Sequence, residues 1–265
     1  MHIRRSLLTL IILFLSFAAL AQTTSKVVDI PTRDGVTQRV LFLSPANPKV
    51  AFIIFPGGHG GLQLLPNGSM KWGEGNFLVR TRQLFVDQGA AVAIVDAPSD
   101  RQEPPYLSGF RQTAEHVTDI KAVIRWLRDN LKVPVWLVGT SRGTQSAAFI
   151  ATELQGTESP EGIVLSSTIL TDPKGRPVLA MPLENIRIPV LVVHHEQDGC
   201  AHCAYSAVPT LMTKLTNSPR KELMSFKGGE SKGDPCEAFA YHGFKGLEQQ
   251  VVQKTVAWVL AKNGF

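Results

Sequence analysis

Short apolar runs alternate with segments of helical periodicity along most of this 265-residue chain. Two opening strands and six later apolar runs are expected at 27–30, 38–43, 50–55, 91–95, 135–138, 163–165, 190–193 and 223–226. Helical spacing of apolar residues is found between or after these runs, at 76–88, 112–131, 144–151, 206–216 and 246–262. Short strands separated by longer helices are typical of βαβ units and a mostly parallel sheet. The sequence therefore predicts one α/β domain in which helices flank a central sheet.

The start of the chain has the organisation of a secretory signal peptide. Two arginines precede a nearly continuous apolar run at 7–20, and a small-x-small pattern ends it just before Gln22. Such a run is too short to span a bilayer comfortably, so cleavage is favoured over an uncleaved membrane anchor. We expect a leader at 1–21, one domain at 22–265, a periplasmic or secreted location and no stable membrane anchor after cleavage.

The charge of the chain argues against a nucleic-acid partner. The net charge is only +5, and no run of five or more basic residues occurs. Domains that bind nucleic acid concentrate lysine and arginine on one face or in such runs. The motifs at the expected strand ends point instead to a small-molecule partner.

The segment VWLVGTSRGTQSAAFI, at 135–150, carries a strand into a small-residue helix through Gly-Thr-Ser-Arg-Gly. A serine on so tight a turn needs glycine two residues before and after it, because strand and helix approach closely. Gly139, Ser141 and Gly143 match this G-x-S-x-G nucleophile elbow. A second match centres on Ser231, but a proline four residues later would disrupt the helix that an elbow requires. Ser141 is therefore the candidate nucleophile, and Ser231 is expected in a loop.

A serine hydroxyl needs a base to take its proton and an acid to orient that base. After a nucleophile elbow, the acid precedes the histidine in the chain. Asp198 lies in the turn HHEQDG that ends the expected strand at 190–193, and the glycine after it permits a tight turn. We expect Asp198 to be the acid. Glu196 in the same turn and Asp172 after the preceding strand are the alternatives.

The expected base is His242. It lies in the loop YHGF between the last expected strand and the final helix, where the order of elements requires the base. His194 and His195 come before the acid, so we expect them to pack in the fold or line a wall. His116 falls within a helix and His2 within the leader, so neither is a candidate.

The run PGGHGG at 56–61 follows the third expected strand and is the candidate oxyanion loop. Acyl transfer needs backbone N–H groups aimed at the developing negative oxygen. One donor is expected from Arg142, which follows the nucleophile, and the other from Gly58 or His59. A phosphate-binding loop is the alternative, but the run lacks the lysine and hydroxyl residue of a P-loop and does not match a dinucleotide loop. No cofactor is expected.

With these residues in order, the sequence resembles the α/β-hydrolase superfamily over 22–265, and a secreted bacterial branch of serine hydrolases in particular. The motifs that carry the resemblance are PGGHGG, GTSRG, HHEQDG and YHGF. The resemblance implies an eight-stranded, mostly parallel sheet and a Ser–Asp–His triad, here Ser141, Asp198 and His242. Only 168–188 separates the sixth and seventh strands, so no large lid domain is expected, and 62–75 is the local covering.

Three cysteines remain in the sequence, which predicts one disulfide and one thiol in an oxidising compartment. Cys200 lies close to the expected acid and Cys236 close to the expected base, so a Cys200–Cys236 bond would join their loops. Cys203–Cys236 is the alternative pairing. A metal site at Cys200, His202 and Cys203, with or without Cys236, is disfavoured because no second paired motif accompanies it and secretion favours disulfides, so no metal is expected.

These observations predict a secreted serine hydrolase, and specifically a carboxylic-ester hydrolase that works through an acyl-enzyme. The expected partner is a small-molecule ester or amide. A peptidase or amidase with the same triad is one alternative, because the same elbow occurs in enzymes that cleave esters and in enzymes that cleave amides. A non-catalytic binding protein on the same fold is the other. The sequence specifies neither an acyl-chain length nor an oligomeric state.

Overall fold

A computed structural model describes residues 23–173 and 175–261. The expected leader at 1–21, and with it the cleavage site before Gln22, lies outside these residues. Among the helices of the described ranges, none is long and apolar enough to cross a membrane.

The core of the molecule is an eight-stranded sheet in the order β1-β2-β4-β3-β5-β6-β7-β8. β1 and β2 pair antiparallel, β2 pairs antiparallel with β4, and the remaining neighbours are parallel. The eight-stranded, mostly parallel sheet is thus confirmed. The strands are β1 (Thr24–Arg33), β2 (Val36–Ser44), β3 (Val50–Phe55), β4 (Ala90–Val95), β5 (Val135–Thr140), β6 (Gly162–Ser166), β7 (Val190–His195) and β8 (Lys221–Phe226).

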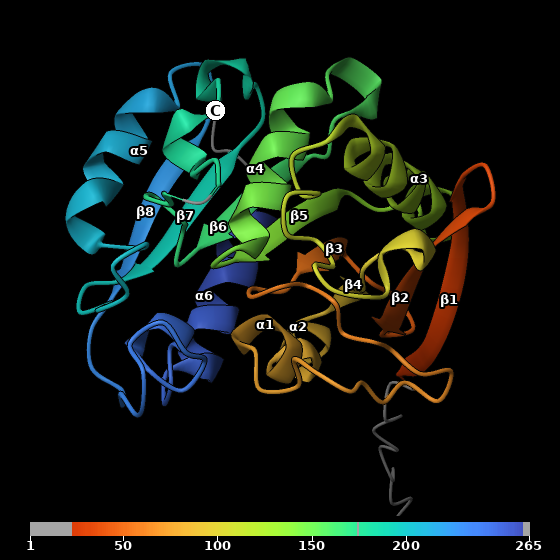
Figure 1. The fold of residues 1–265 in the computed structure, drawn as a ribbon, viewed down its shortest axis with the longest axis horizontal. Helices are drawn as coiled ribbons and strands as arrows, with labels where there is room; N and C mark the ends of the chain where they lie inside the picture. The colour runs from red at the N-terminus through yellow and green to blue at the C-terminus, as the bar shows by residue number, and fades with distance from the viewer. Residues whose placement is uncertain (1–22, 174, 262–265) are drawn as a thin grey trace, which may run out of the picture.

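Helices cover both faces of the sheet, α3, α4 and α5 on one side and α1, α2 and α6 on the other (Figure 1). Each layer buries its own apolar cluster against the strands, so the parallel strands are apolar on both faces. The helices are α1 (Phe77–Arg80), α2 (Arg82–Asp87), α3 (Ala114–Leu131), α4 (Gly143–Glu153), α5 (Val208–Lys214) and α6 (Glu248–Leu260). Short 3₁₀ helices are η1 (Ser99–Arg101), η2 (Gly156–Glu158), η3 (Val178–Ala180), η4 (Leu183–Asn185), η5 (Tyr205–Ala207) and η6 (Tyr241–Gly243).

Two predicted helices differ from the structure. The segment 76–88 forms α1 and α2 rather than one helix, and the break is at Thr81, whose hydroxyl donates to the Phe77 carbonyl. Hydroxyl side chains compete for backbone groups in this way and weaken a helix interior. The segment 206–216 begins as the 3₁₀ helix η5, and α5 starts only where Pro209 can occupy its first turn.

The parallel strands bring the predicted site loops to one edge of the sheet. The loop 56–61 follows β3, Ser141 follows β5, and Asp198 follows β7. Parallel strands end on the same side, which is where ligands bind in open α/β sheets. Between β6 and β7 the described residues form only η3 and η4, so they build no large lid over this edge.

His116 on α3 is a buried core histidine, 1% exposed, near the rings of Phe55 and Phe110. Neither ring nitrogen has a hydrogen-bond partner among the residues that the structure describes. Burial, and then the positive charges of Arg111 and Arg33, lower the pKa of His116 to about 3. The side chain is therefore neutral in the folded protein at neutral pH.

We expect His116→Leu to protect the protein against mild acid. An unfolded histidine binds a proton below about pH 6.5, whereas folded His116 does not until about pH 3, so the wild type loses stability as pH falls through that window. By pH 5 this loss is about 2 kcal/mol. Urea unfolding at pH 7.5 and pH 5 measures it: the variant's free energy of unfolding should fall by about 2 kcal/mol less than that of the wild type. Equal losses in both proteins would contradict the assignment.

Candidate active site

Ser141 lies on the tight turn between β5 and α4, in a strained backbone conformation with φ of 51°. A Cβ atom at Gly139 would come within 2.4 Å of the Gly143 carbonyl oxygen. At Gly143 it would come within 2.0 Å of the Phe55 carbonyl oxygen. Both glycines are therefore needed for strand and helix to pack this closely, as the G-x-S-x-G pattern predicts. Ser231, by contrast, is exposed in the loop after β8, and no helix follows it until η6.

Asp198 and His242 are in direct contact. Asp198 Oδ2 lies 2.9 Å from His242 Nδ1, and Asp198 Oδ1 accepts a hydrogen bond from the Cys200 N–H. Both side chains are buried. The two alternative acids have other partners, since Glu196 pairs with Lys227 at 3.0 Å and Asp172 with Arg142 at 2.6 Å. Of the three candidate acids, Asp198 is the one that meets His242.

Ser141 and His242 line the same cavity, which has a volume of about 470 Å³. His242 Nε2 is buried and has no hydrogen-bond partner among the described residues. The structure therefore brings Ser141, His242 and Asp198 together, but a hydrogen bond joins only the last two. Catalytic hydrogen bonds are commonly long without substrate and tighten when substrate binds.

His194 and His195 support the site loops rather than lining the cavity with Ser141. His194 Nε2 accepts the Thr168 N–H, and burial lowers the pKa of His194 to about 4. The ring of His195 stacks on Tyr241 with 4.4 Å between centroids, and its Nε2 lies 2.8 Å from the Gly228 carbonyl oxygen. His195 thereby links the end of β7 to the loop that carries the expected base.

Two of the candidate oxyanion donors, Gly58 and Arg142, line the cavity of Ser141. The Arg142 N–H at the start of α4 makes no hydrogen bond to any described residue. Gly57 comes nearest to the serine, because a Cβ there would be 3.0 Å from Ser141 Cβ. Gly57 and Gly58 line the cavity of Ser141, whereas His59 lines the neighbouring one. Gly57, which the sequence analysis did not single out, lies directly after β3 and one proline and borders the serine.

The His59 side chain packs within the glycine-rich loop and lines the second cavity rather than that of Ser141. Its Nδ1 accepts the Gly61 N–H at 3.1 Å, and its ring lies between Trp72 and Tyr106, with centroid distances of 3.9 and 4.5 Å. Burial, and then the charge of Arg111, lower the pKa of His59. The imidazole therefore rigidifies the glycine-rich loop.

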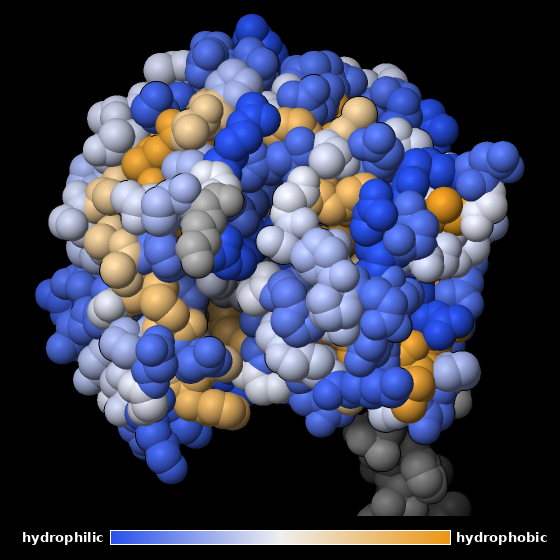
Figure 2. Space-filling view, in the orientation of Figure 1, coloured by the Kyte–Doolittle hydropathy of each residue, from blue (hydrophilic) through white to orange (hydrophobic). Residues whose placement is uncertain are grey.

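Two aromatic residues that the sequence did not single out form walls of the cavity. Trp72 comes from the segment 62–75 and is 37% exposed, and Phe239 comes from the loop before η6 and is 47% exposed. In the view of Figure 2 the surface is hollowed near its centre, with hydrophobic residues to the lower left of the hollow and mainly hydrophilic residues to its right. The partly exposed side chains of Trp72 and Phe239 suit contact with an apolar part of a substrate.

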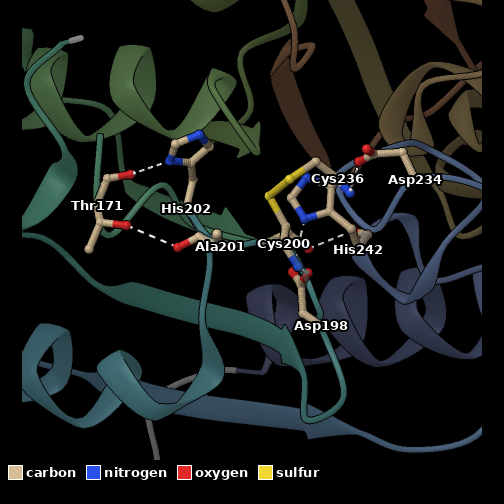
Figure 3. The surroundings of a disulfide bond; sticks show 9 residues. Thr171, Asp198, Cys200, Ala201, His202, Asp234, Cys236 and His242 are labelled. Carbon is tan, nitrogen blue, oxygen red and sulfur yellow. Dashed lines mark hydrogen bonds and ion pairs between the residues drawn. A yellow bond between two sulfur atoms is a disulfide. The ribbon is translucent and has the colours of Figure 1, made fainter. Parts of the chain in front are cut away.

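A disulfide joins Cys200 and Cys236, and Figure 3 shows it beside the His242 ring. Of the two pairings left open by the sequence, this is the one formed. It ties the loop after β7 to the loop before η6, and so ties Asp198 to His242. Cys203 is a buried thiol whose pKa is raised by burial. Its sulfur, that of Cys200 and a ring nitrogen of His242 lie within 4.8 Å of one another, but the disulfide occupies Cys200.

Removal of this disulfide is expected to destabilise the protein. Because 36 positions separate the two cysteines, the double variant Cys200→Ser/Cys236→Ser should lose about 3–4 kcal/mol of unfolding free energy, through the greater freedom of the unfolded chain. Urea titration measures the loss. Cys203→Ala is the matched control, since it removes a buried sulfur and keeps the disulfide. An unfolding midpoint for the double variant equal to that of the control would contradict the expectation.

Solved structures of other proteins share this architecture, although sequence comparison finds no match. No family model matches the sequence, and no curated protein matches it. An esterase from Pyrococcus furiosus matches with a TM-score of 0.64 and 15% identity over 89% of this chain and 90% of that chain. The chain has the α/β-hydrolase fold.

Two further solved structures share this α/β-hydrolase fold. A dienelactone hydrolase from Anabaena variabilis matches with a TM-score of 0.62 and 16% identity over 90% of this chain and 98% of that one. A lidless α/β serine hydrolase from Xanthomonas campestris matches with a TM-score of 0.56 and 18% identity over 90% and 96% of the two chains. At these identities the likeness shows the fold, and function has to be argued from the site.

Proposed function

We propose that the protein is a serine hydrolase that cleaves carboxylic esters, with Ser141, His242 and Asp198 as its triad. The observation that carries the proposal is that a strained elbow serine lines one cavity together with His242, which is paired with the buried Asp198. Esterases and other hydrolases among the structures of the same fold give further support. Ester chemistry is favoured over amide chemistry because the Pyrococcus furiosus protein among them is described as an esterase.

Acylation begins when Ser141 Oγ bonds to the acyl carbon and its proton passes to His242 Nε2. Asp198 keeps the other proton on Nδ1 and stabilises the imidazolium. The carbonyl oxygen takes up negative charge and receives hydrogen bonds from the Arg142 N–H and from an N–H of Gly58 or His59. The bond to the alcohol oxygen then breaks, and His242 returns its proton to the leaving alcohol.

Deacylation repeats these steps with water as the nucleophile. Water gives a proton to His242 Nε2 as its oxygen bonds to the acyl carbon. The bond to Ser141 Oγ breaks, the serine recovers the proton from His242, and a carboxylic acid leaves. The absence of a large lid among the described residues between β6 and β7 suits direct entry from solvent, with Trp72 and Phe239 against the apolar part.

The proposal also includes where in the cell the protein acts. We assign 1–21 to a cleaved leader and 22–265 to the hydrolase, which would act in the periplasm or outside the cell. The Cys200–Cys236 disulfide supports this, because disulfides persist in oxidising compartments. The mass of the protein recovered from a periplasmic fraction tests it: a chain beginning at Gln22 is expected, and a full-length chain would contradict it.

Matched p-nitrophenyl esters and p-nitroanilides of increasing acyl length test the reaction class. We expect turnover of esters and much slower turnover of anilides with the same acyl group. Anilide turnover equal to ester turnover would instead establish a peptidase or amidase. Failure to turn over either series, with no labelling by a fluorophosphonate, would favour a binding protein.

A further inference from the structure

A second cavity, of about 550 Å³, adjoins the cavity of Ser141. Gly58 and Arg142 line both cavities, so the backbone that borders the serine also borders this space. The second cavity has no role in the reaction proposed above. Its lining contains three arginines, Arg111, Arg142 and Arg176, and one acid, Asp172.

Arg111 is the unusual member of this lining, because it is a buried cation without an acidic partner. It is 4% exposed, and it donates to Ser146 Oγ and to the Pro56 and Gly58 carbonyl oxygens. No carboxylate among the described residues forms an ion pair with it. Burial, and then the charge of Arg142, lower the pKa of Arg111 to about 9, so it is still a cation at neutral pH. A buried charge is costly unless an opposite charge accompanies it.

The other charged and polar groups of the cavity leave this excess of positive charge in place. Asp172 is engaged by Arg142 at 2.6 Å, and Arg176 is exposed at the rim. His59 Nδ1 accepts the Gly61 N–H, so the proton of the neutral ring is on Nε2, and the side chain offers a further donor. The cavity therefore presents donors and positive charge, which are the features of an anion site.

We infer that the substrate of this enzyme carries an anionic oxyacid group, a carboxylate or a phosphate, that binds in this second cavity while its ester lies at Ser141. The inference rests on the proposed function and narrows its substrate class. Arg111 supplies the buried charge, Arg176 the charge at the rim, and the shared Gly58–Arg142 border sets a short distance between the anion and the scissile ester.

Two pairs of esters test the inference. Mono-p-nitrophenyl glutarate against its methyl ester places the charge on the acyl side, and 4-acetoxybenzoate against its methyl ester places it on the alcohol side. In at least one of the two pairs, we expect kcat/KM for the charged ester to exceed kcat/KM for the neutral ester by about tenfold or more. The preference should shrink as salt is added, because salt screens the arginines. Titration calorimetry with glutarate and with inorganic phosphate distinguishes the two anions.

Variants of the arginines test which side chains cause the preference for the charged ester. Arg176→Gln should reduce the charged-to-neutral ratio several-fold, and Arg111→Met should abolish it. Arg125→Gln is the matched control, because that guanidinium is exposed on α3 and pairs with Glu158, and the ratio should not change. Arg111 also holds the loop through the Pro56 and Gly58 carbonyl oxygens, so Arg111→Met could fail to fold. In that case Arg176→Gln and the salt series test the anion site.

The outcomes separate this inference from the proposed function. Turnover of the neutral esters, with no preference for charge in either pair and no binding of glutarate or phosphate, would overturn the anion site and leave the hydrolase intact. Absence of any ester turnover or fluorophosphonate labelling would overturn the hydrolase. Binding of glutarate or phosphate that Arg176→Gln weakens would then still support the anion site.

Discussion

Ser141→Ala is expected to lower kcat for p-nitrophenyl ester hydrolysis by about 10⁵–10⁶-fold, as loss of the nucleophile does in serine proteases. The oxygen that forms the acyl-enzyme is gone, and His242 has no proton to take. The fold should be unchanged, because the Ser141 N–H and C=O make the backbone contacts of the turn, to Ser166 and Thr144. Alanine is also small enough for the turn. Steady-state kinetics with a circular-dichroism check measures the effect.

Ser231→Ala is the matched control for this variant. Both serines lie in G-x-S-x-G sequences, but Ser231 is in an exposed loop with no helix directly after it. Its replacement should leave kcat and KM at wild-type values. Loss of activity in Ser231→Ala with activity kept in Ser141→Ala would refute the assignment of the nucleophile.

Asp198→Asn is expected to lower kcat by about 10⁴-fold. Asparagine keeps an oxygen for the Cys200 N–H, but it presents an N–H₂ group to His242 Nδ1 in place of Oδ2. The imidazole would then carry its proton on Nε2, where it cannot accept the proton of Ser141. Because the side chain keeps its size and its contact with Cys200, we expect stability to change far less than activity.

The control for this second variant is Glu196→Gln. Glu196 belongs to the same turn and was the rival acid, but it pairs with Lys227 near the surface. The variant should retain wild-type kcat. A loss in Glu196→Gln comparable to that in Asp198→Asn would mean that the charge of the turn, rather than the contact with His242, supports activity.

Sequence reasoning predicted the parts of the fold that depend on local pattern. Apolar runs located the strands, and the glycines around Ser141 predicted a close strand–helix approach that the structure contains. The order of the motifs along the chain predicted that Asp198 and His242 would meet, since the loops after parallel strands gather at one edge. Chain order and strand periodicity were sufficient for these features.

The parts that could not be predicted depend on contacts between distant segments. Trp72 and Phe239 become cavity walls only because two separate loops reach the same edge. In the sequence nothing distinguishes Arg111, which precedes α3. Only the three-dimensional structure shows that it is buried and has no acidic partner among the described residues. The close approach of Gly57 to Ser141 could not be predicted, because each glycine of the run is equally permissive in sequence and only the packing shows which one meets the serine. No local pattern records such distances.

The central claim is that Ser141 is a nucleophile activated by His242, and fluorophosphonate labelling tests it most directly. The oxidised protein would be treated with the probe, digested and mapped by mass spectrometry, beside His242→Gln and Ser231→Ala. We expect one adduct, on the peptide that contains Ser141, present in Ser231→Ala and lost in His242→Gln. An adduct on Ser231, or an unlabelled wild type that also hydrolyses no ester, would contradict the account.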